Sequence, residues 1–147
     1  MVDLFVEGGG FKSALEYINY KIKNKKILIL GAGGVVSSII FVLKSLEASK
    51  IILSNRTKEK AEAYKKTYSD LEIINWGDIV DFDMIINATS LGLTNKEQIQ
   101  LDFKKVGSGK LFYDLIYNPR KTNFLFKGEQ TGNKIENGMM MFLYQAQ

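Results

Sequence analysis

The chain has 147 residues, of which 46% are hydrophobic, and its formal net charge at pH 7 is a modest +4. This length suits a single domain with a sizeable core. The absence of cysteine and histidine excludes disulfides, thiol catalysis, Cys/His zinc sites and a histidine acid or base, so we predict no metal site and assign any proton transfer to Lys, Asp, Glu or Tyr.

From the first residues we expect no signal peptide. Met1-Val2-Asp3 opens with an acid instead of a basic segment, and no uncharged apolar stretch is long enough to span a membrane. We therefore expect a cytoplasmic protein that does not bind a membrane. We interpret residues 1–9 as an N-terminal remnant or tag-like segment, and residues 10–147 as one domain.

An amphipathic helix that leads into the first strand is predicted to begin at Gly10, because apolar residues recur there at helical spacing. Its apolar stripe comprises Phe11, Ala14, Leu15, Ile18 and Ile22. A lysine-rich stretch follows at 21–26, which we interpret as a solvated helix end and loop. The alternative, contact with nucleic acid or a membrane, lacks an accompanying aromatic platform.

A strand, a glycine turn and a helix form the central feature of the sequence. The apolar run at 27–30 meets closely spaced glycines, which let a pyrophosphate approach the backbone, and the next helix directs its unpaired N–H groups at the charge. A dinucleotide-binding G-x-G-x-x-G fingerprint requires this context, although its third position here is Val36. The alternative is a glycine-rich turn of an unrelated α/β protein. The predicted pyrophosphate contacts are Gly31, Ala32, Gly33, Gly34 and Val35.

The residues after the second predicted strand, at 50–54, indicate which cofactor binds. An acid at this position binds the ribose hydroxyls in NAD-binding domains and would repel a 2′-phosphate. This sequence has Asn55, Arg56 and Thr57 instead, and an arginine with two hydrogen-bonding side chains suits the phosphate. We therefore predict NADP(H) over NAD. The alternative is a plain turn in which Thr57 caps a helix at 58–68.

The rest of the chain alternates strands with helices around a long loop at 88–109. The further strands are predicted at 71–74, 83–87, 110–117 and 134–136, and the further helices at 122–128 and 139–147. This alternation predicts an α/β fold with three layers, namely a doubly wound, mainly parallel sheet of about six strands with right-handed crossovers.

Ligands of such a sheet bind beyond the carboxyl ends of the strands. The segment after the fourth strand consists of Asn87, Ala88, Thr89 and Ser90, which are small and polar where a nicotinamide ribose would lie. The alternative is an ordinary loop, because these residue types are common in loops.

Five motifs follow one another along nearly the whole chain. They are Gly31-Ala32-Gly33-Gly34; Asn55-Arg56-Thr57 with Lys60-Ala61; Asn87-Ala88-Thr89-Ser90-x-Gly92; Asp114-x-x-Tyr117-Asn118-Pro119-x-x-Thr122; and Gly138-Met139-x-Met141 with Gln145. In this order and at this spacing they resemble the motif series of the shikimate dehydrogenase family.

The resemblance implies a Rossmann-type domain in which the glycine turn holds the NADP pyrophosphate and the segment Asn55-Arg56-Thr57 takes the 2′-phosphate. It places residues 87–90, Leu115 and Gly138 beside the nicotinamide ribose and ring. It directs the side chains of Tyr117 and Gln145 toward the shikimate pocket. The implied reaction is the NADPH-dependent reduction of 3-dehydroshikimate to shikimate, on the chorismate pathway to aromatic amino acids.

Members of that family also carry an N-terminal substrate domain, with a catalytic lysine, that this sequence lacks. The last motif of that domain, Asn-Thr-Asp before a Gly-Phe pair, supplies a catalytic acid; Glu7 and Asp3 precede Gly10-Phe11 without it, so neither is assigned the role. We therefore expect this chain alone to bind NADPH with negligible turnover. We also expect apolar surface, available for association, at residues 139–142, with about half of these side chains in the core.

Two other functions fit the same residues. One is the cofactor domain of a related oxidoreductase, such as a quinate/shikimate dehydrogenase or a glutamyl-tRNA reductase. Quinate-active relatives often accept NAD through an acid after the second strand, and Asn55-Arg56 argues against that. The other is a stand-alone NADP(H)-binding or regulatory module without catalysis.

Overall fold

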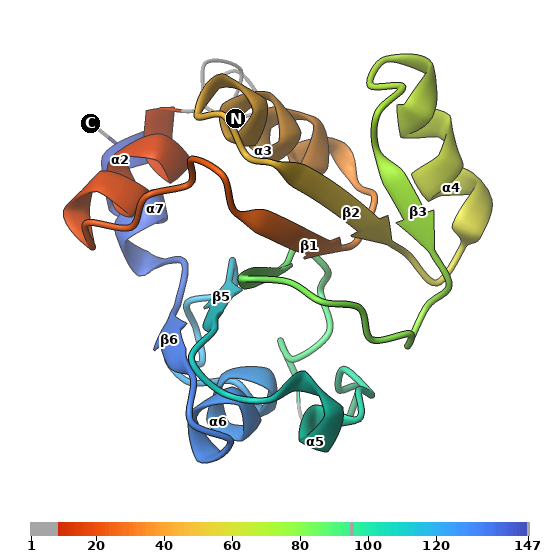
Figure 1. The fold of residues 1–147 in the computed structure, drawn as a ribbon. Helices are drawn as coiled ribbons and strands as arrows, with labels where there is room; N and C mark the ends of the chain where they lie inside the picture. Colours follow the sequence, from red (N-terminus) through yellow and green to blue (C-terminus); the bar gives the residue numbers. More distant parts are fainter. Residues whose placement is uncertain (1–8, 95, 147) are drawn as a thin grey trace.

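The computed structural model describes residues 9–94 and 96–146, so Asp3 and Glu7 lie outside the described part of the chain. Helices and strands alternate along it (Figure 1). In chain order they are α2 (Gly9–Tyr17), β1 (Lys26–Leu30), α3 (Gly34–Ser45), β2 (Lys50–Ser54), α4 (Lys58–Ala63), the 3-10 helix η1 (Tyr64–Lys66), β3 (Glu72–Ile74), β4 (Met84–Asn87), α5 (Phe103–Val106), β5 (Leu111–Asp114), α6 (Asn123–Gln130), β6 (Lys134–Glu136) and α7 (Met139–Gln145).

The strands form one six-stranded parallel sheet in the order β3-β2-β1-β4-β5-β6. The chain starts in the middle at β1, proceeds outward to β3, and then returns to the other side of β1 with β4. This reversal creates a switch point between β1 and β4, and ligands of doubly wound sheets bind beyond the carboxyl ends of the strands at such a point. The predicted Rossmann-type α/β fold is confirmed.

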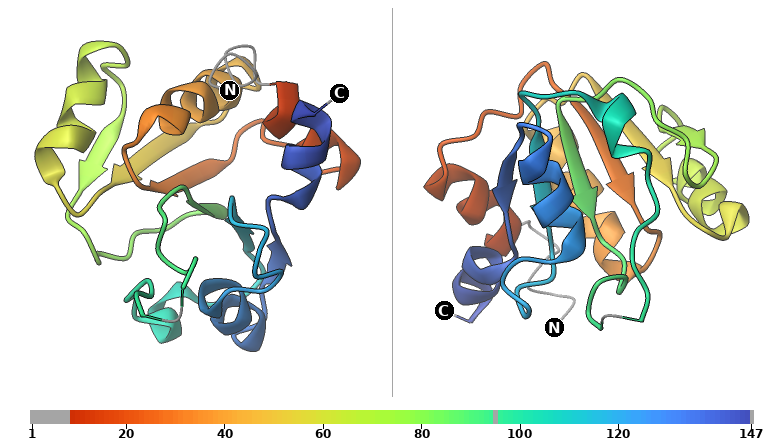
Figure 2. Two further views of the ribbon diagram at one scale, coloured as in Figure 1. Left: turned by 180° about the vertical axis from the view of Figure 1, so that it is seen from behind. Right: turned by 90° about the horizontal axis from the view of Figure 1, so that it is seen from below.

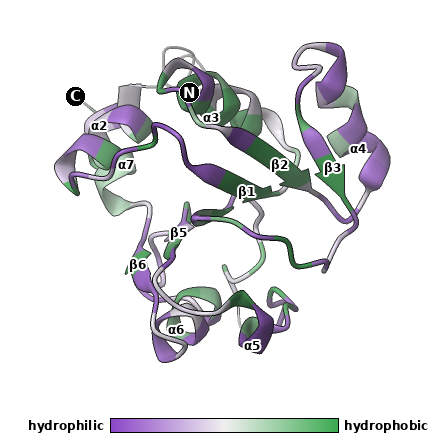
Figure 3. Ribbon diagram, in the orientation of Figure 1, coloured by the Kyte–Doolittle hydropathy of each residue, from purple (hydrophilic) through white to green (hydrophobic). Residues whose placement is uncertain are grey.

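Helices cover both faces of the sheet, with α2, α3 and α7 on one face and α5 and α6 on the other (Figure 2). Strand β1 is buried on both sides, because successive side chains point to opposite faces: Ile27 and Ile29 join the first core, and Leu28 and Leu30 the second. This explains its continuous apolar sequence, which stands out in Figure 3.

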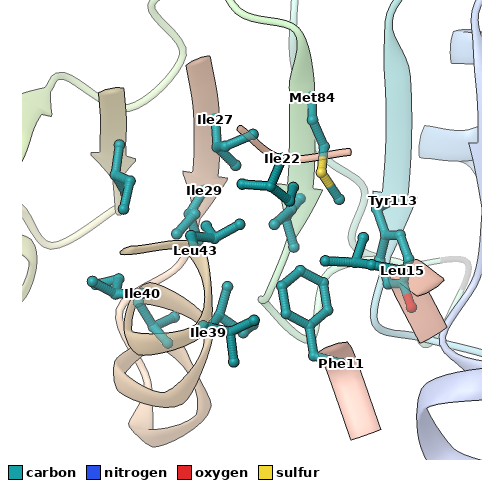
Figure 4. Packing of buried hydrophobic residues seen from close by; sticks show 14 of the residues in the cluster. Phe11, Leu15, Ile22, Ile27, Ile29, Ile39, Ile40, Leu43, Met84 and Tyr113 are labelled. Atoms are coloured by element: carbon teal, nitrogen blue, oxygen red, sulfur yellow. The ribbon is translucent and has the colours of Figure 1, made fainter. Parts of the chain in front are cut away.

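The two cores differ in composition. The first is mainly aliphatic, and Figure 4 shows α2 and α3 packed over β1, β4 and β5. In this core the Phe11 and Tyr113 rings lie edge to face, with 5.6 Å between their centroids. The second core is built around Phe112, whose ring centroid lies 5.0 Å from that of Phe124 and 6.1 Å from that of Phe103.

Several helix and strand ends differ from the sequence predictions. Helix α2 ends at Tyr17, because Asn19 takes the left-handed conformation with a φ of 55°. Ile22 therefore lies on a loop, yet it reaches the same core (Figure 4). The helix predicted at 58–68 is α4 followed by the 3-10 helix η1.

The other differences lie in the second half of the chain. Strand β5 stops at Asp114 instead of residue 117, because the Asp114 carboxylate accepts a hydrogen bond from the Ile116 N–H and turns the backbone. Helix α5 lies within the predicted long loop. Helix α7 ends at Gln145, beside α2 (Figures 1 and 2). None of the helices in the described ranges has the length and apolarity that a membrane crossing needs.

Candidate functional site

The segments predicted to bind a cofactor lie side by side at the carboxyl ends of β2, β1, β4 and β5. Parallel pairing aligns the ends of these strands, because Leu30 pairs with Ser54 and with Asn87. Backbone hydrogen bonds continue beyond the strands, from Gly31 N to Ser54 O, from Ala88 N to Leu30 O and from Leu115 N to Asn87 O. The four segments therefore form one continuous edge along which an extended dinucleotide can lie.

Gly31 and Gly33 have different functions in the glycine turn. Gly31 has a φ of 118°, and a Cβ there would lie 2.8 Å from the Ala88 carbonyl oxygen, so only glycine fits. Gly33 has an ordinary φ of −78°, and apart from Gly33 itself and its two chain neighbours no atom of the described chain lies within 4 Å of where its Cβ would be. The open space beside Gly33 lies at the N-terminus of the 12-residue helix α3, where phosphate oxygens can approach free N–H groups.

Tyr64 stabilises this turn from η1. Its hydroxyl donates a hydrogen bond of 2.6 Å to the Gly33 carbonyl oxygen. A tyrosine hydroxyl is protonated at neutral pH and so can donate this bond, and burial raises the pKa of Tyr64 further above its ordinary value. The sequence did not predict this contact, because no local pattern links residues 31 positions apart.

The segment after β2 combines a turn with an exposed cation. The Asn55 side-chain amide donates to the Thr57 carbonyl oxygen at 2.9 Å, and Thr57 takes the N-cap position of α4 without a side-chain capping bond. Arg56 is exposed, and its guanidinium Nη2 lies 3.8 Å from Oε2 of Glu97 on the loop after β4. The plain-turn interpretation therefore accounts for Asn55, and leaves the Arg56 guanidinium accessible to an anion.

A cleft of about 540 Å³ lies at the switch point, between the loops that follow β4 and β5. It is lined by Val35, Ala88, Thr89, Ser90, Leu93, Leu115, Ile116, Tyr117 and Asn118. All but Leu93, Ile116 and Asn118 were predicted as cofactor or substrate residues from the sequence. This volume is typical of small-molecule sites and accommodates a ring with its ribose.

Two further predicted residues, Gly138 and Gln145, belong to α7 or directly precede it, and Tyr117 of the cleft contacts the same helix. A Cβ at Gly138 would overlap the Leu115 carbonyl oxygen, so glycine permits α7 to approach the cleft. The Tyr117 ring stacks on Phe142, with 4.7 Å between centroids. Gln145 packs against Gly10 of α2, and its Nε2 is buried without a hydrogen-bond partner among the described residues. Its orientation toward a substrate stays a prediction.

Comparisons with known proteins identify the family. The family model described as Shikimate / quinate 5-dehydrogenase matches residues 12–124. The chain belongs to this family. A shikimate dehydrogenase (NADP(+)) from Pelagibacter ubique is 55% identical over 138 residues, which are 94% of this chain and 52% of that protein.

Solved structures of shikimate dehydrogenases share the fold. The enzyme from Aquifex aeolicus superimposes with a TM-score of 0.83 at 34% identity, over 92% of this chain and 50% of that one. The Thermus thermophilus enzyme, in complex with NADP(H) and shikimate, gives a TM-score of 0.84 at 26% identity, over 97% and 52%. The chain spans about half the length of the curated relatives it matches.

One buried carboxylate lies behind the cleft of this dehydrogenase-family chain. Asp114 is fully buried, and its Oδ1 accepts hydrogen bonds from Asn87 Nδ2 at 3.1 Å and from Ile116 N at 3.0 Å. Its Oδ2 accepts one from Thr122 Oγ1 at 2.6 Å. Burial raises the pKa of Asp114 to about 6, although these hydrogen bonds act in the opposite direction. In the described part of the chain, no cluster of acidic side chains could hold a metal ion.

We expect Asp114 to make folding stability pH-dependent. A pKa raised from 3.8 to about 6 means that the folded protein binds this proton more tightly than the unfolded chain. The contribution of Asp114 to folding stability is therefore fully present below pH 3.8 and is lost as the pH rises through about 6. The loss amounts to about 3 kcal/mol. Asp114→Asn does not titrate. The unfolding free energy of the wild type minus that of this variant, from urea titrations, should therefore fall across this pH range, and a constant difference would contradict the assignment.

Proposed function

We propose that residues 10–147 are the NADP(H)-binding domain of a shikimate dehydrogenase. The observation that carries the proposal is the continuous edge formed by the exposed Arg56 guanidinium, the open backbone at Gly33 and the cleft beyond β4 and β5. These three features match, in order, a 2′-phosphate, a pyrophosphate and a nicotinamide with its ribose. The names of the relatives, NADP(+)-dependent shikimate dehydrogenases, support the same assignment.

Each part of the site has its own task in binding. The N-terminus of α3 and the turn at 31–35 hold the pyrophosphate through backbone N–H groups from residue 32 onward, because the Gly31 N–H already donates to the Ser54 carbonyl oxygen. Asn55-Arg56-Thr57 binds the 2′-phosphate, and residues 87–90 with Leu115 and Gly138 border the nicotinamide end. Bound NADPH supplies the hydride, while the residues of this chain position the ring.

The reaction that we propose for the whole protein is the reduction of 3-dehydroshikimate to shikimate, on the pathway to aromatic amino acids. We assign the proton donor and most of the shikimate pocket to the part of the relatives that this chain does not match, with Tyr117 and Gln145 on the substrate side. A cytoplasmic location is part of this proposal.

We also propose that apolar surface beside the cleft contacts this remaining part. Only part of the apolar surface predicted at 139–142 is exposed, since Met141 is buried and Phe142 is 41% exposed. Leu143 of α7 is also exposed, and so is Leu93, which lines the cleft. The stacked Tyr117 and Phe142 rings connect the surface to the cleft itself.

Binding and turnover of the purified chain test the proposal. We expect calorimetry to show NADPH binding that is tighter than NADH binding, and we expect NADPH consumption with 3-dehydroshikimate to stay at the level of a sample without protein. A clear steady-state rate would refute the proposal that the proton donor and most of the shikimate pocket belong to a separate substrate domain. Absence of NADPH binding would refute the cofactor assignment.

The stand-alone NADP(H)-binding or regulatory module would bind the same cofactor. Genomic context separates it from our proposal: a reading frame upstream of Met1, continuous with it and encoding a substrate domain, would exclude the module. A quinate-active relative that accepts NAD is less compatible with the chain, because residues 55–57 include no carboxylate.

A further inference from the structure

The loop at 88–91, which forms one wall of the cleft, is held by hydrogen bonds to the side chain of Asn87. Asn87 Oδ1 accepts hydrogen bonds from Thr89 N at 3.0 Å and from Thr89 Oγ1 at 2.6 Å, and its Nδ2 donates to the Leu91 carbonyl oxygen at 3.1 Å. Thr89 Oγ1 in turn accepts from Leu91 N at 3.0 Å. The conformation of this wall is therefore set by the orientation of one buried amide.

Asp114 fixes the orientation of that amide, because Asn87 Nδ2 also donates to Asp114 Oδ1. The same carboxylate oxygen accepts from Ile116 N, on the opposite wall. The other oxygen accepts a hydrogen bond from Thr122 Oγ1. Thr122 is the N-cap of α6, and its Oγ1 also accepts a hydrogen bond from Leu125 N in the first turn of that helix. A single carboxylate thus joins both walls of the cleft and the helix that follows them.

We propose that Asp114 is a positioning residue that sets the separation of the two walls of the nicotinamide cleft. This inference rests on the proposed function, since it names the task of a residue behind that same site. The carboxylate is fully buried, and its three described donors are an amide, a backbone N–H and a hydroxyl. Burying a carboxylate without a cation beside it costs free energy in an apolar interior. Here its two oxygens accept three hydrogen bonds from different segments, which a single backbone carbonyl oxygen could not do.

The position of this hydrogen-bond network predicts that loss of the Asp114 carboxylate affects the two ends of the bound cofactor differently. Asp114 and Asn87 lie at the ends of β5 and β4, under the nicotinamide end. The adenosine end lies on β1 and β2, where the turn is held by the hydrogen bonds of Gly31 N to Ser54 O and of Tyr64 to Gly33 O. Loss of the carboxylate should therefore loosen the nicotinamide end and leave the adenosine end in place.

Two ligands separate these ends in an experiment on the purified chain. 2′,5′-ADP probes the adenosine end alone, and NADPH probes both ends and reports its nicotinamide through its fluorescence. We expect Asp114→Ala to bind 2′,5′-ADP within 2-fold of the wild type, to bind NADPH at least 5-fold more weakly, and to lose most of the fluorescence change.

Asp114→Asn keeps an oxygen for the two N–H donors and should restore NADPH affinity. Asp83→Asn, which alters a carboxylate at the amino end of β4, is the matched control and should bind both ligands normally.

Each other outcome has a distinct meaning. Unchanged NADPH binding by Asp114→Ala, or an equal loss of both ligands, would overturn the positioning role. Wild-type protein that binds neither ligand would instead refute the proposed function. If Asp114→Ala does not fold, Asn87→Ala removes the hydrogen bonds that join Asp114 to the wall at 88–91, and because the Asn87 side chain is fully buried, this change removes no side-chain contact with the cofactor. Weaker NADPH binding with normal 2′,5′-ADP binding supports the proposal, and normal NADPH binding by this variant overturns it.

Discussion

Gly33→Leu is expected to abolish the binding of both NADP(H) and NAD while the domain stays folded. The backbone at Gly33 has an ordinary φ, and a Cβ there meets no atom of the described chain. The new side chain would fill the space at the start of α3 that we assign to the pyrophosphate. Loss of several phosphate hydrogen bonds at about 1.5 kcal/mol each weakens binding at least roughly 100-fold. Calorimetry with each cofactor, together with a thermal unfolding curve, measures both parts of the prediction.

Gly31→Ala is the matched variant for that experiment, because it changes the same turn two residues earlier. At a φ of 118° and 2.8 Å from the Ala88 carbonyl oxygen, the added methyl group should lower folding stability by roughly 1–3 kcal/mol. Retained cofactor binding by Gly33→Leu would show that the pyrophosphate lies elsewhere. Unfolding of Gly33→Leu would show that the open space is needed by the fold itself.

The strands were predictable because the sheet is buried on both faces. The side chains at 27–30 of β1 and at 51–53 of β2 enter one of the two cores, so each of these strands contains an unbroken apolar run. The ends of helices and strands were less predictable, because single contacts decide them. Asn19 ends α2 through its backbone conformation, and the Asp114 carboxylate ends β5 by binding the Ile116 N–H.

The place of the candidate site in the fold was predictable where one short segment carries the signal. The glycine turn, Arg56 and the polar segment at 87–90 each contain their own signal, and parallel pairing brings them to one edge. Tyr64 and Leu93 were missed, because their contributions depend on contacts between distant segments. Asp114 and Thr122 were noted only as members of a motif, since nothing local reveals that one carboxylate joins two loops.

Arg56→Ala is expected to weaken NADP(H) binding roughly 10- to 100-fold and NAD binding less than about 2-fold, because a hydrogen bond between a guanidinium and a phosphate contributes about 1.5–3 kcal/mol. The guanidinium is exposed, with Glu97 as its ion-pair partner at 3.8 Å. Salt screens such exposed charges, so calorimetry with both cofactors should be carried out at one fixed, low ionic strength.

Two control variants distinguish phosphate recognition from other consequences of losing Arg56. Lys65→Ala removes an equal charge from η1 and should leave the ratio of NADP to NAD affinity unchanged. Glu97→Gln removes the ion-pair partner while keeping the guanidinium, so NADP should bind at least as tightly as to the wild type, because the phosphate no longer competes with a carboxylate for Arg56. If Arg56→Ala instead weakened both cofactors equally, Arg56 would act on the loop that carries Glu97 and not on the 2′-phosphate.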